Sequence, residues 1–168
     1  EWIFSKSLKG YPLMNNAENI YKPYLMEVIS VKDETPDVRT IQLKFRNEDE
    51  AKGFSFKAGQ FAEYSILGEG ECTFCIASSP TRMGCIECSF KLVGKVTSAL
   101  RDAEPGDTVG FRGPYGNWFP IDDLKGKNLL FVGGGIGLAP LRSLFWNVLD
   151  TRQDFGKISM LYGARTVA

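Results

Sequence analysis

The stretch NLLFVGGGIGLAPLRSLFWNVL, residues 128–149, contains a strand pattern, a glycine-rich turn and a helix pattern in succession. Its start, NLLFV, is a continuous apolar run that is typical of a parallel strand buried on both faces. After the glycines, apolar side chains recur at helical spacing on one stripe: Leu141, Leu144, Phe145, Val148 and Leu149. A second apolar run, KISMLY, follows at residues 157–162. The stretch therefore predicts a strand–helix–strand unit that begins a parallel sheet.

The glycine run at residues 133–137 lies between the predicted strand and the predicted helix. A dinucleotide site needs glycines in this place, because they let the backbone approach a pyrophosphate that faces free amides at the helix start. The helix dipole adds only about 0.3–1 kcal/mol, so hydrogen bonds must do most of the holding. Ala139-Pro140 stands where the last glycine of Gly-x-Gly-x-x-Gly would be. Position alone leaves a nucleotide site and a plain tight turn both open.

Short alternating runs precede this unit and predict a six-stranded antiparallel β barrel. They are YLMEVISV (24–31), VRTIQLKF (38–45), FAEYSIL (61–67), ECTFCIA (71–77), IECSFKLV (86–93) and TVGFRG (108–113). We expect an extension or linker at residues 1–20, the barrel at 21–122 and the first βαβ part of an α/β domain at 123–168. Two strands and one helix cannot cover a parallel sheet on both faces. We therefore expect that this domain is cut short at Ala168.

Composition excludes several classes of function. Lys plus Arg and Asp plus Glu both number 20, so no basic excess favours nucleic acid or an anionic membrane. The chain has no histidine, which removes Ser–His–Asp and Cys–His nucleophile sites and a histidine base. No apolar run is long enough to span a bilayer, and the first residues lack the apolar core of a signal peptide. We expect a cytoplasmic protein with reduced cysteines.

A barrel followed by GGGIGLAPLRSL (133–144) resembles the ferredoxin–NADP reductase superfamily. Further matching segments occur in family order: FKAGQF (56–61), EPGD (104–107), GPYGNWFP (113–120) and LYGART (161–166). Within the superfamily the chain is most similar to the flavin subunits of cytoplasmic NiFe hydrogenases of the sulfhydrogenase gamma type, of anaerobic sulfite reductases and of dihydroorotate dehydrogenase electron-transfer complexes. The resemblance implies a flavin-binding barrel and a nicotinamide-binding domain.

The resemblance also implies site residues. The family holds FAD on a strand of pattern Arg-x-Tyr-Ser/Thr, which corresponds here to Cys72, Thr73, Phe74 and Cys75. Phe74 would stack on the isoalloxazine, and Cys75, the expected catalytic contact, would lie near flavin N5. Ser89, Phe90 and Lys91 would line the flavin, and Val96, Thr97 and Ser98 belong to the turn that holds its pyrophosphate. Phe74 and Phe90 could equally be barrel core, and Lys91 a solvated charge.

For NAD(P)H, the resemblance implies a site at the glycine turn. The expected contacts are Gly134, Gly135, Ile136, Gly137, Ala139 and Pro140, with Arg165 as a reader of a 2′-phosphate. The sequence does not distinguish NADH from NADPH.

Two departures from the family pattern concern the flavin. Cys72 replaces the family arginine and so removes a charge-assisted hydrogen bond worth roughly 1.5–3 kcal/mol. Uncompensated, this loss weakens binding by about ten- to a hundred-fold. The related hydrogenase-type subunits also tend to lack this arginine. A thiol at Cys75 donates a weaker hydrogen bond than a hydroxyl, which affects hydride transfer more than cofactor binding.

All four cysteines lie in two Cys-x-x-Cys motifs, a spacing that also suits a tetrathiolate metal site. If the two segments pair as antiparallel strands about Pro80, Cys72 lies opposite Cys88 and Cys75 opposite Cys85. Residues three apart in a strand point to opposite faces, so the two pairs could not close around one zinc at about 2.3 Å. The barrel interpretation is favoured, and a zinc or iron–sulfur site stays open as the alternative.

The sequence thus predicts an NAD(P)H-dependent flavin oxidoreductase (diaphorase) subunit. It would carry electrons between NAD(P)H and an iron–sulfur partner through FAD, inside a multi-subunit redox complex such as a hydrogenase or sulfite reductase. The cluster cysteines are expected beyond residue 168. One alternative is a free-standing NAD(P)H:acceptor reductase. The other is a reductase-like binding module with a structural tetra-cysteine metal site and no flavin.

Overall fold

The computed structural model describes residue 19 and residues 21–165. Apart from Asn19, the predicted extension at residues 1–20 lies outside the described residues. The first part of the fold contains β1 (Tyr24–Thr35), β2 (Val38–Phe45), α1 (Glu48–Gly53), β3 (Phe61–Ile66), β4 (Gly70–Cys75), β5 (Ile86–Lys91), α2 (Lys95–Asp102) and β6 (Thr108–Tyr115). The second contains β7 (Leu129–Gly134), α3 (Leu138–Asp150) and β8 (Ile158–Gly163). Three short 3₁₀ turns lie at Ile121–Leu124, Gly135–Gly137 and Arg152–Asp154.

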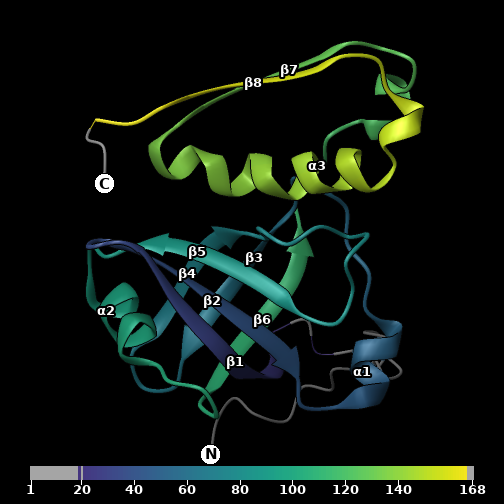
Figure 1. Ribbon diagram of the computed structural model, residues 1–168. Coiled ribbons are helices and arrows are strands. Elements are labelled where there is room, and N and C mark those ends of the chain that lie inside the picture. Colours follow the sequence, from purple (N-terminus) through teal and green to yellow (C-terminus); the bar gives the residue numbers. More distant parts are fainter. Residues whose placement is uncertain (1–18, 20, 166–168) are drawn as a thin grey trace, which may run out of the picture.

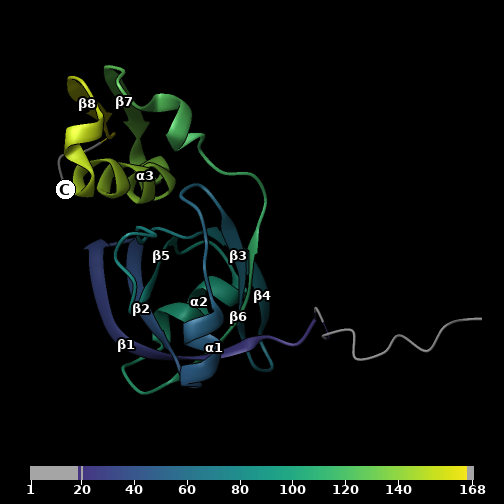
Figure 2. The same cartoon turned by 90° about the vertical axis from the view of Figure 1, so that its right-hand side faces the viewer.

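The six strands of the first part form one antiparallel sheet in the order β4-β3-β6-β1-β2-β5. The sheet curls into a barrel, which lies below the second part in Figures 1 and 2. This confirms the predicted six-stranded antiparallel architecture. Its two edge strands, β4 and β5, meet at a single bridge between Ile76 and Cys88. The barrel therefore has a seam, along which β4 and β5 share no regular ladder.

The predicted pairing of the cysteine segments is wrong. Cys72 and Cys75 lie opposite Tyr64 and Phe61 on β3, and Cys88 lies opposite Ile76 rather than Cys72. The register is displaced by four residues because the chain after Ile76 does not form a tight hairpin about Pro80. Instead, this segment leaves the barrel to contact α3, where Ser143 Oγ donates a hydrogen bond of 2.7 Å to the carbonyl of Ser78.

This displacement is even, so it leaves the side chains of both segments on the faces that they would have in the predicted pairing. Inward-facing apolar side chains from all six strands fill one core, to which Leu100 of α2 and Phe54 also contribute. Ile76, Ile86, Cys88 and Phe90 lie in this core, and Phe74 packs against it. The ring centroids of Phe74 and Phe90 are 5.8 Å apart across the seam.

The second part is the predicted strand–helix–strand unit. β7 and β8 pair in parallel, with Leu129 opposite Ile158, and α3 lies between this small sheet and the barrel (Figures 1 and 2). Phe131, Leu144, Val148 and Phe155 form the buried centre of a second core.

The expectation that β7 is buried on both faces is wrong for the residues that the structure describes. Leu130 is 62% exposed, Val132 65% and, on β8, Leu161 60%. The reason is that α3 covers one face of the two strands, and these three side chains point to the other. No helix among the described residues has both the length and the apolar character needed to cross a membrane.

Candidate functional site

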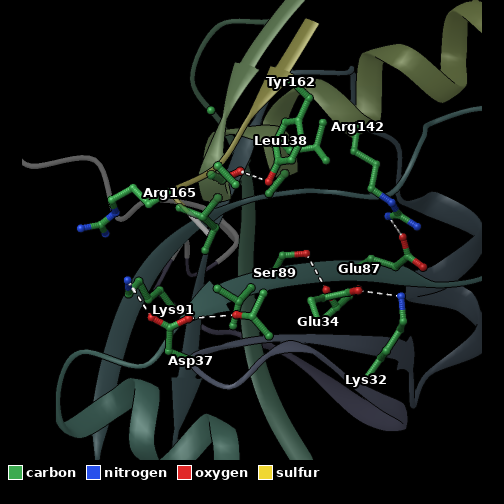
Figure 3. Close-up of a pocket in the computed structure, with 18 of the residues that line it drawn as sticks. Lys32, Glu34, Asp37, Glu87, Ser89, Lys91, Leu138, Arg142, Tyr162 and Arg165 are labelled. Carbon is green, nitrogen blue, oxygen red and sulfur yellow. Dashed lines mark hydrogen bonds and ion pairs between the residues drawn. The ribbon is translucent and has the colours of Figure 1, made fainter. Parts of the chain in front are cut away.

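A cleft of about 1510 Å³ lies between the outer face of the barrel and the glycine turn (Figure 3). Strands β1, β2 and β5 form one wall, and the other comprises the end of β7, the start of α3 and the residues at the end of β8. The cleft brings together seven of the predicted site residues: Ser89, Lys91, Gly134, Gly135, Ile136, Ala139 and Arg165. The predicted flavin-strand residues Cys72 to Cys75 do not line it.

The glycine turn leaves room for a ligand against its backbone. A Cβ atom built on Gly135 or Gly137 would meet nothing within 4 Å, and on Gly134 its nearest contact would lie at 3.8 Å. Gly135 has a φ of +52°, a left-handed conformation that disfavours side chains. The N–H of Leu138, the first residue of α3, is bonded to the carbonyls of Gly135 and Ile136. The first N–H groups of the 3₁₀ turn itself, at Gly135–Gly137, have no acceptor within that turn and are the ones that a ligand can reach. Pro140 fits here because the first turn of a helix needs no N–H.

Polar groups cover the barrel wall of the cleft. The hydroxyls of Ser89 and Thr40 lie 2.8 Å apart, and Lys91 Nζ lies 2.7 Å from the carboxylate of Asp37. The hydrogen bond from Lys91 is the main cause that lowers the pKa of Asp37. Alternation along β5 explains this wall, because Ser89 and Lys91 point outward while Cys88 and Phe90 point into the core. Lys91 therefore lies on the cleft, but in an ion pair.

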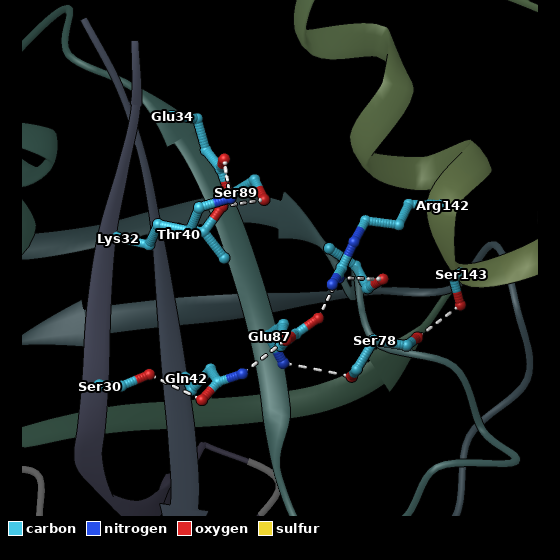
Figure 4. A network of polar contacts seen from close by, with 11 residues as sticks. Ser30, Lys32, Glu34, Thr40, Gln42, Ser78, Glu87, Ser89, Arg142 and Ser143 are labelled. Atoms are coloured by element: carbon cyan, nitrogen blue, oxygen red, sulfur yellow. Dashed lines mark hydrogen bonds and ion pairs between the residues drawn. The ribbon is translucent and has the colours of Figure 1, made fainter. Parts of the chain in front are cut away.

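Two of the cleft residues that sequence reasoning missed connect its two walls. Glu87 of β5 forms an ion pair with Arg142 of α3 and thereby joins the two walls (Figure 4). Burial pushes the pKa of Glu87 upward, but hydrogen bonds from Arg142 and Gln42 outweigh it and leave the pKa below its ordinary value. One signal was available for Glu87, which alternates with Ser89 and Lys91 on the outward face of β5. None marked Arg142 as its partner.

The predicted flavin strand, β4, borders the seam. Phe74 lies 6.0 Å from the ring of Tyr64 and extends partly into the core, as the barrel-core interpretation anticipated. Thr73 Oγ1 donates a hydrogen bond of 2.7 Å to Glu63, which occupies its hydroxyl. Burial raises the pKa of the Cys75 thiol, which therefore stays protonated at neutral pH. Phe90 is 1% exposed, so its side chain acts in packing.

The seam itself offers free backbone groups. In the described part of the chain, β4 forms a ladder with β3 alone, and β5 with β2 alone. The edges that face each other therefore carry N–H and C=O groups that no ladder uses. Residues Cys72–Cys75 contribute one edge and Ser89–Lys91 the other.

The start of α2 lies beyond the seam. Thr97 Oγ1 accepts hydrogen bonds from the N–H groups of Val93 at 3.0 Å and Gly94 at 2.9 Å. Ser98 Oγ donates to the Gly94 carbonyl at 2.9 Å. Val96 packs against the barrel core. These side chains shape the loop, so an anion there would bind to the amides of the first helical turn.

The four cysteines do not assemble a metal site. All four are free thiols, and within the described residues no three His, Cys, Asp or Glu side chains are placed to hold a metal ion. Cys88 is fully buried, and that burial raises its pKa well above the ordinary value. The thiolate form, which binds metals, is therefore disfavoured at Cys88.

Comparison with known proteins confirms the resemblance seen in the sequence. A family model described as oxidoreductase FAD-binding domain matches residues 25–119, and one described as oxidoreductase NAD-binding domain matches residues 131–168. The gamma subunit of sulfhydrogenase 2 from Pyrococcus furiosus is 39% identical over 88% of this chain and 51% of its own length. A probable dihydroorotate dehydrogenase B electron-transfer subunit from Methanocaldococcus jannaschii is 33% identical over 86% of this chain and 49% of its length.

Among solved structures, a ferredoxin–NADP⁺ reductase from Neisseria gonorrhoeae with bound FAD and NADP superposes with a TM-score of 0.67. It is 26% identical, and the match covers 84% of this chain and 57% of that one. The chain spans about half the length of the curated relatives it matches.

Proposed function

Because this chain belongs to the ferredoxin–NADP reductase superfamily of FAD-binding and NAD-binding oxidoreductases, we propose that it carries electrons between NAD(P)H and an iron–sulfur partner through bound FAD. One observation carries the proposal. The cleft places an open glycine turn at the start of a helix against β5, the strand that borders the seam of the barrel.

The residues present fit FAD in the seam. The free backbone edges at Cys72–Cys75 and Ser89–Lys91 suit the donors and acceptors of an isoalloxazine ring, and the first-turn amides of α2, at residues 95–97, suit its pyrophosphate. Bound FAD would supply the chemistry that the side chains lack, because it takes two electrons as hydride and can release them singly. Phe74 is the proposed stacking residue.

Cys75 is the proposed flavin contact. It shares the outer face of β4 with Thr73, and it keeps its proton at neutral pH because burial raises its pKa. A thiol can therefore donate a weak hydrogen bond at this position.

The glycine turn is the proposed nicotinamide dinucleotide site. Gly134, Gly135 and Gly137 let the pyrophosphate approach the backbone, and Ala139 lines the cleft beside them. Tyr162 Oη donates a hydrogen bond of 3.2 Å to the Gly135 carbonyl and so holds the turn in place. Arg165, exposed at the end of β8, is the proposed reader of a ribose phosphate.

The proposed context is a multi-subunit redox complex in the cytoplasm. Relatives of this chain are named as the gamma subunit of a sulfhydrogenase and as an electron-transfer subunit. We propose that the iron–sulfur cluster is bound outside residues 1–168. The proposed division of the chain places the flavin-binding barrel at residues 21–122 and the start of the nicotinamide-binding domain at 123–168.

The test is to purify the full-length protein and measure its visible spectrum, FAD content and oxidation of NADH and NADPH with an artificial acceptor. We expect a two-band flavin spectrum, one FAD per barrel and turnover with at least one of the two nucleotides. A colourless protein that takes up no added FAD would refute the proposal. A colourless protein with stoichiometric zinc, or a brown protein without flavin, would instead support the binding module with a structural tetra-cysteine metal site.

A further inference from the structure

We propose that Glu87 and Arg142 form a positioning pair, which holds the glycine turn at the distance from β5 that electron transfer requires. The inference deepens the proposed function and rests on it. Neither residue is assigned to hold a cofactor. Their contact joins the two walls of the cleft, and Arg142 lies one helical turn along α3 from the end of the glycine turn.

Glu87 is held rigidly on the barrel side. Gln42 Nε2 donates to Glu87 Oε1 at 2.7 Å, and Ser30 Oγ donates to Gln42 Oε1 at 2.6 Å. The backbone N–H of Glu87 donates to Ser78 Oγ at 3.1 Å. The side chain is only 12% exposed. Groups on β1, β2 and β5 thus fix the position of the Glu87 carboxylate independently of Arg142 (Figure 4).

Arg142 transmits this position to α3. Its guanidinium donates to the other oxygen of Glu87 and, at 3.2 Å, to the carbonyl of Ala77. The next residue, Ser143, is fully buried and bonded to the carbonyl of Ser78. Arg142 lies one turn after Leu138, where α3 begins and the glycine turn ends. Any tilt of α3 that breaks the pair would move the glycine turn relative to β5.

A second ion pair between the same two parts provides a matched control. Arg82 forms three hydrogen bonds to Asp150, at 2.7, 2.9 and 3.2 Å, and its guanidinium lies 3.8 Å from the ring centre of Trp146. Asp150 follows Arg142 by eight residues, or about 12 Å along the helix. This pair also joins the barrel to α3, but at the end that is distant from the cleft. If the ion pairs only hold α3 against the barrel, both should matter equally. If the proposal is right, the position of the glycine turn depends on Glu87 and Arg142 alone.

The variants follow from this chemistry. Glu87→Gln keeps the size but removes the charge, and its amide offers one acceptor oxygen where the carboxylate offers two, one to Gln42 and one to Arg142. Arg142→Met removes the guanidinium and keeps the stem. Each single change leaves a partly buried charge without its partner, which destabilises by itself. The double variant avoids that effect and removes the contact cleanly. Asp150→Asn is the control at the distant end.

The first readout needs no cofactor turnover. Hydrogen–deuterium exchange of the full-length protein without nucleotide should quicken at residues 77–79 and 138–141 in the double variant. Asp150→Asn should leave those two segments unchanged. Equal exchange in the double variant and the parent would overturn the proposal, whether or not the protein proves to be a flavoenzyme.

The second readout is the limiting rate at which saturating NAD(P)H reduces the bound flavin. A displacement of about 1 Å can lower such a rate by about 100-fold, so we expect a 10- to 100-fold loss in both single variants and in the double variant. The loss of rate in the double variant should be no larger than in either single variant, because all three variants remove the same interaction. Flavin content should match the parent, KM should change by less than about threefold, and Asp150→Asn should retain the parent rate.

Two results of this second experiment would overturn the proposal. A raised KM with an unchanged limiting rate would make Arg142 a direct nucleotide contact. An equal loss of rate in Asp150→Asn would make both pairs general docking contacts. If the parent shows no flavin reduction at all, the proposed function fails, and the exchange experiment alone decides whether the pair holds α3.

Discussion

The barrel and the strand–helix–strand unit bury their apolar residues in different ways. In the barrel, Tyr64, Phe90 and Phe111 are enclosed on all sides by the six strands and α2. In the second unit, α3 covers one face of β7 and β8, while Leu130 and Val132 on the other face remain more than half exposed. Most of the fully buried apolar side chains that stabilise the fold therefore lie in the barrel, whereas the second unit provides the open glycine turn. Substitutions should therefore affect stability in the first region and nucleotide binding in the second.

The largest expected effect is a cavity in the barrel. Phe111 is fully buried, with ring centroids of Tyr24, Phe45, Phe54 and Tyr64 at 5.4–6.4 Å. Phe111→Ala should lower the free energy of unfolding by about 3–5 kcal/mol. Leu130→Ala, on the exposed face of β7, should change it by less than about 0.5 kcal/mol. Denaturant titration of both variants measures the difference, and comparable losses would erase the contrast between the two regions.

The glycine turn should show the reverse behaviour. Gly137→Val puts a side chain into open space in a residue whose φ of −60° any amino acid adopts. It should raise the KM for NAD(P)H at least tenfold, about 1.4 kcal/mol, and leave FAD content and stability unchanged. Gly135→Val should raise KM similarly but also cost about 1–2 kcal/mol of stability, because Gly135 has a left-handed backbone. Loss of flavin in Gly137→Val would instead indicate a structural turn.

A smaller effect concerns the one buried side-chain polar atom that lacks a hydrogen-bonding partner among the described residues, Tyr64 Oη. The Cys88 thiol lies beside it, and burial raises the pKa of Tyr64 well above its ordinary value. Tyr64→Phe removes the unpaired hydroxyl and should stabilise the protein by about 1 kcal/mol. Thermal unfolding at matched FAD occupancy checks the sign. A loss of stability would show that the hydroxyl has a partner in the full-length protein.

The smallest effect is expected at Cys75. Cys75→Ser supplies the hydroxyl that the family normally places near the flavin, at nearly the same size, so flavin reduction should hold or quicken and the melting temperature should scarcely change. Zinc and iron content, melting temperature and NAD(P)H-driven flavin reduction are measured beside the parent. Stoichiometric metal in the parent, lost in Cys75→Ser together with several kcal/mol of stability, would contradict the flavin-contact assignment.

The sequence predicts the elements of the fold better than their contacts. Alternation in segments such as VRTIQLKF and the change of period at residues 128–149 are local signals, and both predictions are confirmed. The pairing of Cys72 with Cys88 was wrong because the loop after Ile76 follows contacts with α3, which no local pattern reports. Glu87 and Arg142 were missed for the same reason. They are 55 residues apart, and their meeting depends on how the two parts dock.

The central claim is that the seam between β4 and β5 holds the flavin beside the glycine turn. Its most direct test is a crystal structure of the full-length protein with FAD. We predict isoalloxazine density bounded by the backbone of Cys72–Cys75 and Ser89–Lys91, with the pyrophosphate at the start of α2. A continuous β4–β5 ladder through a closed seam, with the flavin elsewhere or absent, would contradict the claim.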